Sequence, residues 1–226
     1  MMPLPDWWQS DKPWRIADCL EVMRGMPDKC VDLVLTDPPY GIGDKWVGGS
    51  GSKHGWSQSH VQKDVRNDWD FKPPKQEVFK EIMRISKEQI IWGGNYFNLP
   101  PSRCWLIWNK PERGFTLAEA EMAWTSFDNV VRVFDHPRHI PNREHPTTKP
   151  IKLFEWCLSH NWARGVKTVF DPFIGSGTTL LACRKTGRVG LGCEINPDYE
   201  PIIRKRCLVD IPKITEGWFE GGQECE

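Results

Sequence analysis

Residues 166–185 read VKTVFDPFIGSGTTLLACRK and divide into a strand, a loop and a helix. The apolar run up to Phe170 is typical of a short buried strand, and the stretch from Thr178 predicts a helix that closes at Gly187. The loop between them holds two glycines, which let a backbone approach a ligand closely, and the helix N-terminus offers N–H donors. This order indicates a ligand site at the turn between a strand and a helix of an α/β sheet.

The rest of the chain alternates between strand-like and helix-like stretches in the same way. We predict strands over 31–36, 89–92, 104–108, 121–125, 130–134, 166–171 and 189–194, and helices over 74–85, 150–160, 178–185 and from about 197. Such alternation favours a mostly parallel sheet with helices on both faces, with the strands at 121–125 and 130–134 as a late antiparallel pair. Because 226 residues suffice for one α/β domain, we expect 1–226 to be a single catalytic domain.

Composition excludes several classes of protein. No apolar run is long enough to span a membrane and no secretory signal is recognisable, so we expect a cytoplasmic protein. Thirty basic and thirty acidic residues give zero net charge, which argues against tight non-specific nucleic-acid binding but allows a local basic cleft. Eight cysteines show no CxxC pair and no zinc spacing, so we expect reduced thiols and no metal site.

A second motif, Asp-Pro-Pro-Tyr at 37–40, follows the predicted strand 31–36 directly. Two prolines alone would indicate a rigid turn, but a carboxylate and a tyrosine bracket them where ligands bind in open α/β sheets. The Asp37 carboxylate and the Pro38 carbonyl can accept hydrogen bonds from an aromatic amino group and stabilise the positive charge that develops when it attacks. Tyr40 offers a face for an extruded base.

Glu194 strengthens the interpretation of the glycine loop. Taken alone, Gly-x-Gly is a weak signal that a tight turn also explains, and Leu180 stands where a dinucleotide-binding motif has its third glycine. Glu194 ends the next predicted strand, where an acid commonly binds both hydroxyls of a ribose, although a solvated carboxylate remains the alternative. The absence of a lysine-containing phosphate loop fits a nucleoside cofactor without phosphates, such as S-adenosylmethionine.

Taken together, DPPY at 37–40, HPTTKP at 145–150, FDPFIGSGTT at 170–179 and GCEINPDY at 192–199 closely resemble the amino-methylating DNA methyltransferases. The catalytic motif precedes the cofactor loop, which resembles the β group of that family. The resemblance covers about residues 14–209. It implies a Rossmann-like methyltransferase fold, circularly permuted, with a mostly parallel seven-stranded sheet.

The resemblance also implies residue roles. Asp37, Pro38, Pro39 and Tyr40 would form the catalytic pocket. The residues implied to bind S-adenosylmethionine are Asp18, Asp37, Thr147, Lys149, Asp171, Phe173, Gly175, Ser176, Gly177, Thr178, Glu194 and Asn196. His145, Pro146 and Pro150 complete the HPTTKP segment, in which Thr148 replaces the more usual glutamine. For Lys149 a surface charge before a helix is the alternative interpretation.

The chain is short for the family, so we assign target recognition in double-stranded DNA to two loops, 41–67 and 110–146. Their candidate phosphate contacts are Lys45, Lys53, Lys63, Arg66, Arg132, Arg138 and Arg143, with ordinary solvated loop charge as the alternative. Family resemblance makes a homodimer and a cognate restriction endonuclease plausible partners.

The resemblance and the DPPY motif favour methylation of adenine N6 over four alternatives. The aspartate of DPPY favours adenine, because relatives with SPPY mostly methylate cytosine N4, which is the nearest alternative. A catalytically silent DNA- or cofactor-binding module is a further alternative, against which the intact DPPY argues. Methylation of RNA or protein amides goes with Asn-Pro-Pro-Tyr, and cytosine C5 chemistry needs a cysteine after a proline, which this chain lacks.

Overall fold

A computed structural model describes residues 12–41, 72–113, 118–137 and 149–207. Within these ranges one sheet has the strand order β1-β8-β7-β2-β3-β5-β4-β6, eight strands where seven were expected. The strands are β1 (Trp14–Ile16), β2 (Val31–Thr36), β3 (Ser86–Trp92), β4 (Trp105–Asn109), β5 (Ala120–Thr125), β6 (Arg132–Asp135), β7 (Thr168–Asp171) and β8 (Val189–Glu194). In the described part, β5 alone runs antiparallel to its neighbours.

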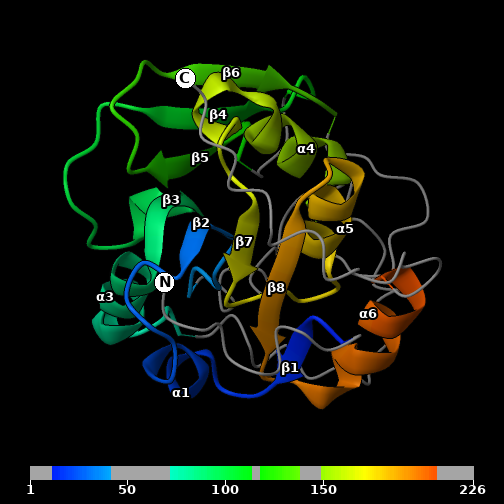
Figure 1. Cartoon of the computed structure of the whole chain (residues 1–226). Helices are drawn as coiled ribbons and strands as arrows, with labels where there is room; N and C mark the ends of the chain where they lie inside the picture. Colours follow the sequence, from blue (N-terminus) through cyan, green and yellow to red (C-terminus); the bar gives the residue numbers. More distant parts are fainter. Residues whose placement is uncertain (1–11, 42–71, 114–117, 138–148, 208–226) are drawn as a thin grey trace, which may run out of the picture.

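Helices lie on both faces of the sheet, as the alternating sequence predicts (Figure 1). Helices α1 (Cys19–Arg24) and α3 (Gln76–Ile85) contact each other on one face, whereas α4 (Ile151–Ser159) and α5 (Thr178–Lys185) pack together on the other. The last helix, α6 (Glu200–Cys207), packs beside α5. Short 3-10 turns are η4 (Gly94–Tyr96), η5 (Asn161–Ala163) and η6 (Pro197–Tyr199).

The central strands alternate their side chains between two hydrophobic cores. On β2, Leu33 and Leu35 face the core under α4 and α5, while Val34 faces the core under α1 and α3. On β7, Val169 and Phe170 divide in the same way. All five side chains are fully buried, as expected for a parallel sheet covered on both faces. This double cover fixes the ends of β2 and β7, from which both sequence motifs emerge.

Two details of the predicted fold were wrong. The strands at 120–125 and 132–135 do not pair with each other: β4 lies between them, antiparallel to β5 and parallel to β6. The sequence also gave no sign of β1 or α1, which are only three and six residues long. The region 110–146, expected to contact DNA, contains β5 and β6, close to the two strands predicted within it.

The predicted state of the cysteines is confirmed for the seven that the structure describes. All seven are free thiols, and five of them are buried: Cys104, Cys157, Cys183, Cys193 and Cys207. Several pack in the two cores as small apolar side chains do. Of the helices in the described ranges, none has the length and apolar character that a membrane crossing requires.

Candidate active site

The Asp-Pro-Pro-Tyr segment begins immediately after the buried end of β2. The Oδ1 atom of Asp37 accepts one hydrogen bond from the Tyr40 hydroxyl and another from the Lys149 ammonium, each at 2.5 Å. Lys149 also donates to the Tyr40 hydroxyl oxygen at 2.8 Å. A carboxylate, a phenol and an ammonium therefore meet at the tip of one strand.

Lys149 is buried, which excludes the interpretation that it is a surface charge before a helix. Its side chain is only 7% exposed, and Pro150 next to it is the N-cap residue of α4. Burial alone would lower the pKa of Lys149, but the carboxylates of Asp37 and Glu121 outweigh it and raise that pKa. The lysine is therefore a cation at neutral pH, held 3.0 Å from Glu121 as well.

The Tyr40 ring belongs to a small aromatic group. It stacks on Tyr96 with ring centroids 4.9 Å apart, and Phe97 meets it edge-on at 6.2 Å. Gly93, at the start of η4, adopts φ +67°, and a Cβ atom there would lie 2.1 Å from the Tyr40 ring. Only glycine permits this approach, so the turn after β3 fixes the position of Tyr40.

The glycine loop leaves the end of β7. The buried Asp171 carboxylate accepts hydrogen bonds from Thr179 and from the backbone N–H of Phe173, and these bonds close the loop onto α5. Burial raises the pKa of Asp171 to about 6. Both glycines of the loop have positive φ, Gly175 +49° and Gly177 +86°.

The two glycines differ in their surroundings. A Cβ atom on Gly177 would lie 2.7 Å from the sulfur of Cys207, so that glycine makes room for α6. Among the described residues, a Cβ atom on Gly175 would meet nothing within 4 Å. Ser176 is buried, and Arg206 of α6 donates to both its hydroxyl and its carbonyl oxygen. Gly175 therefore has no described neighbour on its Cβ side, whereas Ser176 and Gly177 pack against α6.

Glu194 ends β8 beside Gly175. Its carboxylate accepts from the backbone N–H of Gly175 at 3.0 Å and from that of Asn196 at 2.9 Å. Burial raises its pKa. Asp18 is exposed and caps α1 by accepting from the N–H of Leu20 at 2.7 Å, and Ala17 beside it donates to the Glu194 carbonyl. Glu194, Gly175 and the end of β1 therefore surround one region.

A buried hydrogen bond joins the two motifs. The Thr36 hydroxyl, one residue before Asp37, donates to Asp171 at 2.6 Å. The strands that carry them, β2 and β7, are adjacent and parallel, so both motifs leave the same edge of the sheet. The structure thus brings the DPPY segment and the glycine loop to neighbouring strand ends, which is where ligands bind in open α/β sheets.

Several candidate residues lie outside the described ranges. They are Thr147 and the proposed DNA contacts Lys45, Lys53, Lys63, Arg66, Arg138 and Arg143. Arg132 is described and is exposed on β6. Sequence reasoning missed Glu121 and Lys110, which form an ion pair next to Lys149. Glu121 could have been noticed because it lies in a predicted strand among apolar residues, where an ionised side chain needs a partner of opposite charge.

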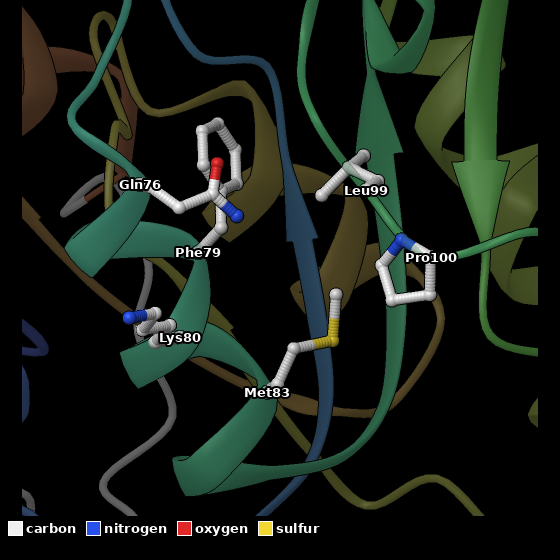
Figure 2. A pocket seen from close by; sticks show the side chains of 6 residues that line it. All are labelled: Gln76, Phe79, Lys80, Met83, Leu99 and Pro100. Atoms are coloured by element: carbon white, nitrogen blue, oxygen red, sulfur yellow. The ribbon is translucent and has the colours of Figure 1, made fainter.

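An apolar pocket lies away from these charged groups. It has a volume of about 280 Å³ and lies between α3 and the segment after η4 (Figure 2). Its lining residues are Gln76, Phe79, Lys80, Met83, Leu99 and Pro100. Phe79 separates it from the Tyr40 aromatic group by packing on Phe97 at 4.8 Å. The pocket contains neither sequence motif and is not the candidate active site.

Comparisons with known proteins agree with this geometry. A model of the N6/N4 DNA methylase family matches residues 92–205, half of the chain. The type II methyltransferase M.HpaI of Haemophilus parainfluenzae is 24% identical over 237 residues, covering 84% of this chain and 72% of its own. The matched region of the family model contains Lys149, the glycine loop and Glu194.

Solved structures share the fold. The cytosine-N4-specific PvuII DNA methyltransferase superposes with a TM-score of 0.55 at 17% identity, over 88% of each chain. The M1.HpyAVI structure in complex with S-adenosylmethionine gives a TM-score of 0.52 at 20% identity, over 85% of this chain and 98% of its own. With the family match over half of its length, the chain belongs to the N6/N4 DNA methylase family.

Proposed function

We propose that this family member transfers the methyl group of S-adenosylmethionine to N6 of an adenine flipped out of double-stranded DNA. The observation that carries the proposal is the adjacency of two strand ends: Asp37 follows β2, the glycine loop follows β7, and the Thr36–Asp171 hydrogen bond joins them. An acceptor for an amine and a loop for a nucleoside cofactor then open on one edge of the sheet.

The residues beside the glycine loop fit S-adenosylmethionine. Gly175 has no described neighbour on its Cβ side and lies next to the Glu194 carboxylate, whose two oxygens are oriented by backbone N–H groups. A carboxylate held in this way retains lone pairs for the ribose hydroxyls. Asn196 donates to the Glu194 carboxylate, and Ala17, next to Asp18, donates to the Glu194 carbonyl. The proposed cofactor site includes Asp18 and Asn196 together with Phe173, Thr147 and Lys149. When bound, the cofactor supplies an electrophilic methyl group on a sulfonium.

The chain's own residues activate the amine. The Asp37 carboxylate and the Pro38 carbonyl accept hydrogen bonds from its two N–H groups, which frees the nitrogen lone pair for attack on the methyl carbon. Bound S-adenosylmethionine would give up its methyl group to this nitrogen and leave as the neutral thioether, and the methylated amine would release one proton to solvent. Asp37 stabilises the positive charge until that proton leaves, and Tyr40 holds the base by stacking.

Adenine is proposed over cytosine on the aspartate of DPPY. PvuII DNA methyltransferase, which shares the fold, is cytosine-N4-specific, so methylation of cytosine N4 is the second candidate. Both bases present an exocyclic amino group to the same acceptors. The strand-end geometry supports both, and the choice of adenine depends on the resemblance of the motif.

Mass spectrometry of nucleosides distinguishes these candidates. DNA incubated with the protein and labelled S-adenosylmethionine should contain labelled N6-methyladenine, which the Asp37→Ala variant should not produce. Labelled N4-methylcytosine would overturn the choice of base. No label in either base, with folded protein that binds the cofactor, would point to a silent binding module.

The proposal extends to the partners and the target site. We propose that the loops 41–67 and 110–146 contact the DNA. We further propose that residues 1–226 form one catalytic domain, which works together with a restriction endonuclease or with a second copy of the protein. Long-read sequencing of DNA from cells that express the protein would report the modified base and its sequence context together.

A further inference from the structure

Four buried or half-buried charges form a chain that ends at the catalytic carboxylate. Lys110 donates to Oε1 of Glu121, Lys149 lies 3.0 Å from Oε2 of the same glutamate, and Lys149 donates to Asp37 at 2.5 Å. The lysine side chains are 6% and 7% exposed, and the Glu121 side chain is 22% exposed. Positive and negative side chains alternate along this series of four, so each charge lies beside an opposite one.

Antiparallel strands hold the remote end of this chain. Glu121 is on β5, directly opposite Trp108 of β4, and Lys110 immediately follows β4. The backbone N–H of Lys110 donates to the Glu119 carbonyl at 2.9 Å, which extends the strand pairing. The Lys110 ammonium also lies 4.5 Å from the centre of the Trp108 ring. Glu121 is thus placed by the sheet rather than by a loop.

Glu121 is ionised throughout the range in which the enzyme would work. Its burial alone would raise its pKa, but the ammonium groups of Lys149 and Lys110 outweigh that effect and lower it to about 2. The carboxylates of Glu121 and Asp37 therefore share the ammonium of Lys149. An ammonium has three N–H donors, so its position between two carboxylate partners is set by both of them.

This sharing matters because of what Asp37 must do. Its carboxylate has to accept a hydrogen bond from the substrate amine and then stabilise a positive charge on nitrogen. The Lys149 ammonium already donates to Oδ1 of Asp37, and without Glu121 it would be held by the Asp37 carboxylate alone and would neutralise more of its negative charge. We propose that Glu121 is a positioning residue, which retains the Lys149 ammonium so that Asp37 stays available to the amine. This inference rests on the proposed function.

The test compares isosteric and charge-balanced variants in single-turnover methylation. Glu121→Gln should lower the rate of the methyl-transfer step roughly 10- to 100-fold. This is the range typical of residues that hydrogen-bond to a functional side chain and orient it without touching the substrate. The dissociation constant of S-adenosylmethionine should change less than about twofold, which is well under 1 kcal/mol, because the substitution leaves Glu194 and the glycine loop unaltered. Glu121→Asp keeps the charge and should restore a large part of the rate.

A second variant guards against loss of folding. Glu121→Gln alone removes the carboxylate that Lys110 and Lys149 share, whereas Lys110→Met with Glu121→Gln removes one charge of each sign. The double variant should fold and should still transfer the methyl group slowly. In it, Asp37 is the one carboxylate of these four charged residues that still pairs with Lys149. The matched control is Glu81→Gln: Glu81 is 20% exposed and pairs with Arg84 at 2.6 Å on α3, and its variant should keep the wild-type rate.

The outcomes separate this inference from the proposed function. A wild-type protein that methylates no DNA overturns the proposed function, and the inference with it. A wild-type protein that methylates DNA, together with a folded double variant that methylates at the same rate, overturns the role of Glu121 alone. A rate loss that tracks the unfolded fraction in every variant would likewise reduce Glu121 to a purely structural residue.

Discussion

The Nζ atom of Lys149 lies 2.5 Å from Oδ1 of Asp37, although 112 positions separate the two residues in the sequence. The aspartate follows β2 and the lysine precedes α4, so the tip of one strand is completed by the beginning of a distant helix. The contact places a buried ion pair between the two motifs that the family resemblance connects. Its geometry leads to the following expectations.

Removing the Asp37 carboxylate should abolish methyl transfer without abolishing cofactor binding. Asp37→Ala removes the acceptor and the negative charge, so we expect a rate loss on the order of 10³-fold, comparable with losing an electrostatic group aimed at a developing charge. Isothermal titration calorimetry should show binding of S-adenosylmethionine within a few-fold of wild type, because Glu194 and the glycine loop are untouched. Full activity in this variant would reject the assignment of Asp37.

Glu194→Ala should weaken cofactor binding by about 10- to 100-fold, since a charge-assisted hydrogen bond contributes about 1.5–3 kcal/mol. The control is Asp198→Ala, which removes an exposed acid from the turn that follows β8. Calorimetry on both variants checks the expectation. Equal dissociation constants for wild type and Glu194→Ala would contradict the ribose role.

Two glycines offer a matched test of how Tyr40 is positioned. Gly93 and Gly187 have nearly the same φ, +67° and +69°, but only Gly93 has a neighbour that a Cβ would strike, the Tyr40 ring. Gly187→Ala should lower the free energy of unfolding by about 1 kcal/mol, from backbone strain alone. Gly93→Ala should cost more.

The two variants should also differ in activity. Because Tyr40 must shift in Gly93→Ala, this variant should methylate more slowly per folded molecule, whereas Gly187→Ala should match wild type. Urea unfolding and methylation assays at matched folded concentrations provide the measurements. Equal activity in both variants would show that the Tyr40 ring tolerates displacement.

Asp171 predicts a pH dependence of stability. Burial raises its pKa from 3.8 to about 6, so its contribution to folding is fully present below about pH 3.8 and is lost as the pH rises through 6. The loss corresponds to about 3 kcal/mol at 1.36 kcal/mol per pKa unit. Asp171→Asn keeps acceptors for Thr36 and Phe173 and lacks this titration.

The free energy of unfolding of wild type minus that of Asp171→Asn should therefore fall by about 2 kcal/mol between pH 4 and pH 7. Urea unfolding of both proteins across this range measures the difference, and other titrating groups cancel in the subtraction. A difference that is flat or rises with pH would show that the Asp171 pKa is not raised in the folded state.

The features predicted well from sequence are those that local pattern determines. Apolar runs marked β2, β7 and β8, and the spacing of apolar side chains marked α3. The strand β3 begins at Ser86, three residues before its predicted start, because it follows α3 without a loop and its first residues are polar. The motif residues were recognisable because few other sequences bring an aspartate, two prolines and a tyrosine together.

What local pattern could not give was pairing between distant segments. The strands β5 and β6 are neighbours in sequence, yet β4 separates them, because an inner strand has two edges to fill. The role of Glu121 depends on Lys149, which is 28 positions away, and no periodicity encodes that contact. Strand β1 is too short for alternation to be visible, and it is held by its pairing with β8.

The position of β7 next to β2 has a consequence for synthesis on the ribosome. Asp32 of β2 and its hydrogen-bond partner Thr168 are 136 positions apart, so one edge of this central strand has no neighbour until most of the chain has been made. At translation rates of about 5–20 residues per second that delay is roughly 7–27 seconds. During this time an apolar strand edge is open to pairing with other chains. N-terminal fragments that stop before β7 should aggregate, and the nascent chain should benefit from a chaperone that binds apolar strands.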